Sequence, residues 1–187
     1  MRRFCLFLVA TIMLATAAFA GAETTGLFDQ LKGRTFTFSS GVGAWSTELV
    51  FEETGFFTGS YHDSEMGETG EGYPDGSVYG CLFHGELSDP VMADEYTWTA
   101  TISIEKDEGQ APEIIEDDIR YVTSEPYGVE KAQTVTVFLP GTPVEKLPED
   151  FLFWSHLQEI DPEAKTLPFY AIWSEEDAAG FINDADE

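Results

Sequence analysis

The chain has 187 residues, with 35 Asp and Glu against 9 Lys and Arg and a formal net charge of -26. Hydrophobic residues make up 43% of it and aromatic residues 14%, which is enough to bury a core and excludes a disordered acidic tail. Because so few cations cannot neutralise a row of phosphates, the composition also excludes nucleic acid and an anionic membrane as expected partners.

The first residues have the order of a secretory signal peptide: a basic start, an apolar run and a small-residue cleavage site. Cleavage after Ala20 or after Ala22 fits equally well, so residues 1–22 are predicted to be removed and 23–187 to form the mature domain. We expect a secreted or periplasmic protein. Cys5 lies inside the apolar run and not at a cleavage point, which argues against a lipid anchor. The sequence contains no second apolar run of this kind, so no transmembrane segment is predicted in the mature chain.

Loss of the two early arginines would make the net charge two units more negative than -26. Two explanations for this acidity remain open, a general adaptation of the surface and a local cation site. Cys81 would be the one thiol left, so no internal disulfide is expected. It shares an apolar strand face with Tyr79 and Phe83, which predicts a buried, unreactive cysteine.

Alternating apolar and polar residues predict a series of short strands after a short helix at residues 25–31. The first predicted strands cover residues 34–39, 45–52, 56–62, 78–87 and 96–104. Each strand has one apolar face, which is typical of antiparallel sheets.

After Lys106 the pattern weakens, and the acidic residues 107–118 predict no element. Further strands are predicted at residues 119–124, 134–139 and 167–173, and a short amphipathic helix at residues 148–157. About eight strands joined by short turns predict a single all-β domain, an antiparallel meander with one or two short helices. We expect a closed up-and-down barrel that closes on its first strand, with a two-sheet sandwich as the alternative.

Several runs have a recognisable character: FSSGVGAWSTEL, GSYHDSEMGETGEGYPDGSVYGCLFHGEL, YVTSEPYG and LPGTPVEKLPEDF. They resemble a family of exported bacterial proteins and lipoproteins of unknown function, over most of residues 31–155. The tripeptide at residues 43–45, Gly-Ala-Trp, resembles the Gly-x-Trp near the start of lipocalin-like barrels. That second resemblance implies an eight-stranded barrel with an interior of ligand size.

An acidic, glycine-rich segment at residues 62–76 joins two predicted strands. Calcium binds six to eight oxygen ligands, and a loop of this kind can fold carboxylates inward around the ion. The spacing does not match an EF-hand, so a calcium site and a solvated hairpin loop are both open. The predicted metal ligands are Asp63, Glu65, Glu68, Glu71 and Asp75.

Four aromatic residues fall on the inward faces of successive predicted strands: Trp45, Tyr61, Tyr79 and Trp98. If the barrel has an open mouth, they form a pocket for a flat or apolar ligand. If the barrel is filled, they belong to its core, as is common for barrels of this strand number.

No recognised catalytic motif is present: the sequence lacks G-x-S-x-G, H-E-x-x-H, a P-loop and G-x-G-x-x-G. His62 and His84 fall on neighbouring predicted strands, where a zinc site and surface histidines beside acids are the alternatives. We expect an exported, non-enzymatic binding module for a small ligand. A structural or protein-interaction module of the cell envelope is the alternative, with a hydrolase as the second. An apolar patch on the outside would favour the interaction module.

Overall fold

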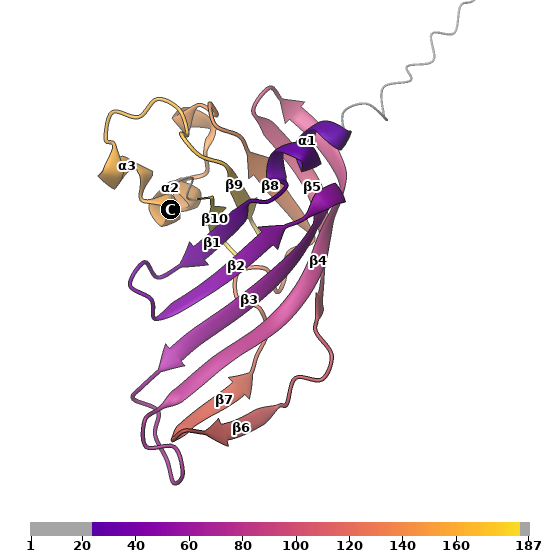
Figure 1. Cartoon of the computed structure of the whole chain (residues 1–187). Coiled ribbons are helices and arrows are strands. Elements are labelled where there is room, and N and C mark those ends of the chain that lie inside the picture. Colours follow the sequence, from indigo (N-terminus) through magenta and orange to yellow (C-terminus); the bar gives the residue numbers. More distant parts are fainter. Residues whose placement is uncertain (1–23, 184–187) are drawn as a thin grey trace, which may run out of the picture.

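A computed structural model of the chain describes residues 24–183 (Figure 1). The predicted signal peptide, with both cleavage alternatives, lies outside the described residues. Strands make up most of the fold, and the helices are few and short. Within residues 24–183 no helix has the length and apolar character needed to cross a membrane.

Ten strands and five short helical segments follow one another along the described chain. The strands are β1 (Thr35–Ser39), β2 (Trp45–Phe51), β3 (Phe56–Glu65), β4 (Ser77–Asp94), β5 (Thr97–Lys106), β6 (Glu113–Glu116), β7 (Ile119–Thr123), β8 (Thr134–Phe138), β9 (Ala171–Ser174) and β10 (Ala179–Ile182). The helical segments are α1 (Thr24–Leu31), η1 (Glu53–Gly55), η2 (Val144–Lys146), α2 (Glu149–Ser155) and α3 (Leu157–Ile160).

Eight of the strands close into an antiparallel barrel in the order β1-β2-β3-β4-β5-β8-β9-β10. The barrel closes because β10 pairs with β1, where Ile182 lies opposite Thr37. The predicted all-β antiparallel barrel that closes on its first strand is therefore confirmed. The structure adds β10, a strand that the sequence patterns did not predict.

The other two strands, β6 and β7, form a hairpin outside the barrel, beside the first half of β4 (Figure 1). β7 runs parallel to β4, with pairs from Ser77 and Arg120 to Gly80 and Thr123. Neither β6 nor a parallel pairing was predicted. The sequence of β6, EIIE, lacks the alternation that marks a half-buried strand, and all four of its residues are exposed.

The strand β4 has 18 residues, and one of its edges pairs with two different strands. β7 pairs with residues 77–80, and β5 pairs from Phe83 onward. The opposite edge of the first half pairs with β3. Between the two partners, Cys81 and Leu82 belong to neither ladder, and this short stretch positions the site described below.

Side chains fill the interior of the barrel. Phe83 packs against Gly59 on the neighbouring strand, and Phe57 packs in the same way against Gly85, so each ring occupies the place that a Cβ would take. The segment before β8 enters the core as well, since Val129 is only 2% exposed. The inward-facing apolar residues of the alternating strands therefore form a filled core.

A second apolar cluster lies where α2 packs beside β10, with Phe151 fully buried against Trp173. Trp154 of α2 also contacts the barrel core, where its ring centroid lies 4.9 Å from that of Phe38 and 6.0 Å from that of Trp45. The helix predicted at residues 148–157 is observed as α2, with α3 following it.

Candidate functional site

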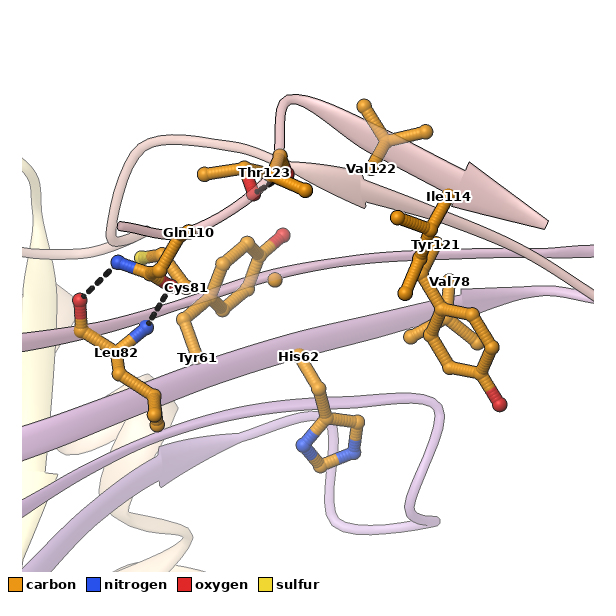
Figure 2. Close-up of a pocket in the computed structure, with 12 residues that line it drawn as sticks. Tyr61, His62, Val78, Cys81, Leu82, Gln110, Ile114, Tyr121, Val122 and Thr123 are labelled. Atoms are coloured by element: carbon orange, nitrogen blue, oxygen red, sulfur yellow. Dashed lines mark hydrogen bonds between the residues drawn. The ribbon is translucent and has the colours of Figure 1, made fainter. Parts of the chain in front are cut away.

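A groove of about 290 Å³ lies where β3, β4 and the β6–β7 hairpin run side by side (Figure 2). The apolar side chains of Val78, Leu82, Ile114 and Tyr121 form much of its wall, with polar groups of His62, Gln110 and Thr123 beside them. Gly80 and Ala111 also line it, and Tyr61, Cys81 and Val122 contribute from the other side of the sheet. We call this feature the outer groove, because its apolar wall residues stand on the face of the sheet that points away from the barrel core.

Strand register explains why the apolar side chains share a face. Val78 pairs with Tyr121, and Tyr121 pairs with Ile114, so the three stand in a row across β4, β7 and β6. Leu82 lies four residues further along β4 and therefore on the same face. The exposed fractions of Leu82, Ile114 and Tyr121 are 55%, 46% and 38%, which is unusual for large apolar side chains gathered at one place.

The floor of the outer groove is bare backbone around Gly80. A Cβ on this residue would lie 2.5 Å from the carbonyl oxygen of Tyr61, so the close approach of β3 requires glycine here. His62 is the partner of Gly80 across the ladder. Figure 2 shows that His62 and Tyr61 point to opposite sides of β3, as strand alternation requires.

The side-chain amide of Gln110 closes the end of the groove. Its Oε1 accepts a hydrogen bond of 2.7 Å from the backbone N–H of Leu82, and its Nε2 donates to the carbonyl oxygen of Leu82 at 2.8 Å (Figure 2). The same Nε2 donates to the carbonyl oxygen of Asp107 at 2.9 Å. The hydroxyl of Thr123 donates to the carbonyl oxygen of Ala111 at 2.6 Å. These bonds fix the segment that leads into β6.

Arg120 anchors the hairpin on the other face of the sheet. It forms an ion pair of 2.5 Å with Glu68, donates to the hydroxyl of Tyr79 at 2.9 Å and to that of Ser77 at 3.1 Å, and lies over the ring of Tyr73. The hydrogen bond from Tyr79 and the contact with Arg120 lower the pKa of Glu68. The outer groove is therefore supported from behind by a connected polar network.

The five acids predicted as calcium ligands are not assembled into a metal site. Glu68 is bound by Arg120 and by the hydroxyl of Tyr79, which lies 2.7 Å from its carboxylate. Within residues 24–183, no group of three or more His, Cys, Asp or Glu side chains is placed to hold a metal ion. The observed role of Glu68 is to fasten its loop to the β6–β7 hairpin. Asp63 and Glu65 lie on β3, where Asp63 is half-buried and Glu65 is exposed, and Glu71 and Asp75 are exposed in the segment between β3 and β4.

The four aromatic residues predicted as a ligand pocket lie in different environments. Trp98 is 2% exposed and belongs to the barrel core. Trp45 packs against Tyr127, with 5.1 Å between ring centroids, and Tyr61 packs against the same ring at 6.2 Å. Tyr79 belongs to the Arg120 network. Of the four predicted residues, Tyr61 lines the outer groove, and burial raises its pKa to about 12.

The two histidines considered for zinc lie apart in the register. His62 is opposite Gly80, whereas His84 is opposite Thr58. The Nδ1 of His84 lies 2.8 Å from the carboxylate of Asp107, and this hydrogen bond raises the pKa of His84.

Cys81 is 5% exposed, and burial raises its pKa to about 11. The predicted burial of this cysteine is confirmed. A thiol with a raised pKa holds little thiolate at neutral pH, so its chemical environment fits a structural residue.

Comparison of the chain with models of protein families, with curated proteins and with solved structures finds no match. The resemblance to exported proteins of unknown function therefore rests on the sequence runs quoted above.

Proposed function

We propose that the protein is an exported, non-enzymatic binding module that holds an apolar ligand in the outer groove. The observation that carries this proposal is the groove itself, a hollow of about 290 Å³ in which Leu82, Ile114 and Tyr121 remain exposed to solvent. Covering these side chains with an apolar ligand removes their surface from water, which is favourable by about 25 cal/mol per Å² of apolar area.

The rigidity of the walls supports the same proposal. Arg120 fastens the β6–β7 hairpin to the loop of Glu68, and Gln110 fastens the incoming segment to Leu82. A preformed site loses less conformational entropy when a ligand binds than a site that must first be ordered. The groove volume is also near the lower end, roughly 300 Å³, of small-molecule sites.

Ile114 and Ile115 provide a matched pair for the test. They are neighbours on β6 with exposed fractions of 46% and 49%, and they point to opposite faces of the hairpin. Only Ile114 lines the outer groove. We expect Ile114→Ser to weaken binding of the uncharged fluorescent probe N-phenyl-1-naphthylamine, and Ile115→Ser to leave it unchanged.

The measurement is a fluorescence titration of the chain from residue 23 onward and of both variants. Circular dichroism of each protein shows that the fold is kept. Absence of probe binding to the parent chain, or an equal loss in the two variants, contradicts the proposal.

A protein-interaction module is the second candidate, because exposed apolar side chains on the outside of the barrel are the feature expected of it, and α2 and α3 carry two more besides those of the outer groove. Phe153 is 69% exposed and Ile160 is 76% exposed. A partner that binds the parent chain and the Ile114→Ser variant, but not Phe153→Ser, would favour this function and place the interface on the helices.

A further inference from the structure

A second hollow of about 260 Å³ lies on the same outer face, next to the outer groove. Leu82 lines both hollows, so they share one wall residue. The second hollow also contains Val50, Thr58 and Ser60, and two carboxylates, those of Glu48 and Asp107. We call it the acidic hollow.

Pairing across three strands gives the geometry of the acidic hollow. Glu48 of β2 lies opposite Ser60 of β3, and Ser60 lies opposite Leu82 of β4. On the far side of Leu82, the backbone N–H of Asp107 donates to its carbonyl oxygen at 3.0 Å. With roughly 4.8 Å between adjacent strands, the two acids lie at opposite ends of a row that passes through Ser60 and Leu82.

The two hollows differ in charge character. The outer groove has mainly apolar walls, whereas the acidic hollow is bordered by two carboxylates. Among the described residues, no Lys or Arg lines either of them. The Nδ1 of His84 approaches the carboxylate of Asp107, while Glu48 lies at the opposite border.

We infer that the ligand is an amphiphile with a cationic head, whose apolar tail lies in the outer groove and whose head lies between Glu48 and Asp107 in the acidic hollow. This inference rests on the proposed function and specifies its ligand class. An anionic head would meet two carboxylates on a chain of net charge -26, so an anionic lipid or fatty acid fits poorly.

Three amphiphiles with the same dodecyl chain test the inference: a trimethylammonium, a maltoside and a sulfate, each kept below its micellar concentration. Their affinities are measured by displacement of N-phenyl-1-naphthylamine at about 0.15 M salt, where long-range attraction is largely screened. We expect the cation to bind most tightly and the sulfate most weakly. Ile114→Ser should weaken all three.

Glu48→Gln tests the position of the head, and Glu52→Gln is its control. Glu48 lies on β2 and Glu52 directly follows that strand; both are exposed, and only Glu48 lines the acidic hollow. We expect Glu48→Gln to weaken binding of the trimethylammonium amphiphile by about two- to fivefold, the range of one exposed ionic contact. Binding of the maltoside should be unchanged. Glu52→Gln should change neither.

The outcomes separate the inference from the proposed function. The head position is overturned if the cationic amphiphile binds no more tightly than the maltoside, or if Glu48→Gln and Glu52→Gln reduce its affinity equally. Binding in the outer groove then still stands. If none of the amphiphiles displaces the probe and Ile114→Ser has no effect on probe binding, both are overturned.

Discussion

The side chain of Gln110 replaces a neighbouring strand at Leu82. Its amide accepts a hydrogen bond from the N–H of Leu82 at 2.7 Å and donates one to the carbonyl oxygen of Leu82 at 2.8 Å. This is the pairing that an adjacent strand would supply, and it occurs where β5 has ended and β7 has not begun. Backbone groups that lose their partners lower stability, so this contact explains how β4 changes partners without an open gap.

Removing the Gln110 amide should therefore destabilise the chain locally. We expect Gln110→Ala to lower the free energy of unfolding by about 1 kcal/mol, and to speed hydrogen exchange at the Leu82 amide. Gln133→Ala, on an exposed residue of another loop, is the control. Urea denaturation and hydrogen exchange measure the two effects, and unchanged exchange at Leu82 would contradict the assigned role.

The packing of Phe83 on Gly59 predicts a large effect for one added methyl group. In Gly59→Ala the new Cβ would overlap the Phe83 ring inside a filled core, and overpacking of this kind costs about 1–3 kcal/mol. Gly67→Ala is the matched control, because nothing lies within 4 Å of its Cβ position. Thermal unfolding of both variants checks the prediction, and equal midpoints would refute it.

The barrel could be predicted from the sequence because its strands alternate regularly between buried and exposed residues. β2 is an example, with Thr47, Leu49 and Phe51 buried and Glu48 and Val50 exposed. Antiparallel neighbours joined by short turns then leave few ways to enclose an apolar face. The alternation of apolar and polar residues, together with the short turns, is therefore sufficient to predict most of the barrel.

The outer groove could not be predicted in the same way. Alternation assigns Val78 and Leu82 to the solvent side, and it gives no reason for a hairpin to cover that side. The position of β6 and β7 depends on the contacts of Arg120 with Glu68 and of Gln110 with Leu82, which connect residues far apart in the sequence. Arg120, one of only two arginines in the described part of an acidic chain, was the available indication, because a half-buried cation needs a partner.

Asp94 predicts a defined pH dependence. A hydrogen bond that its carboxylate accepts from the ammonium of Lys146, at 2.7 Å, and another from the N–H of Tyr96 lower the pKa of Asp94 from 3.8 to about 2. Because the folded pKa is below the unfolded one, the stabilising effect is complete above about pH 4 and is lost as the pH falls towards 2.

We expect the stability difference between the parent chain and Asp94→Asn to be present at pH 6 and to disappear near pH 2. Lys146→Met should remove much of this pH dependence, because it removes the main cause of the shift. Comparing variants at each pH separates Asp94 from the many other acids of the chain. A difference that stays constant from pH 6 to pH 2 would contradict the assignment.

The acidity of the chain predicts a response to salt without a preference for calcium. Repulsion among 35 acids weakens at higher ionic strength, so the melting temperature should rise with sodium chloride. Because the described residues contain no preformed metal cluster, calcium and magnesium chloride at equal ionic strength should give equal shifts. A larger shift with calcium, lost in Glu71→Gln, would return the loop at residues 62–76 to the calcium interpretation.

Cys81 provides a chemical measure of how firmly the site region is closed. Its thiol is 5% exposed with a pKa of about 11, so a disulfide reagent such as dithionitrobenzoate should react slowly with the folded chain and rapidly in urea. Gln110→Ala should accelerate labelling, because Cys81 lies beside the Leu82 backbone that Gln110 holds. Gln133→Ala should not. Rapid labelling of the folded parent chain would show that this part of β4 opens readily, and the groove walls would then not be preformed.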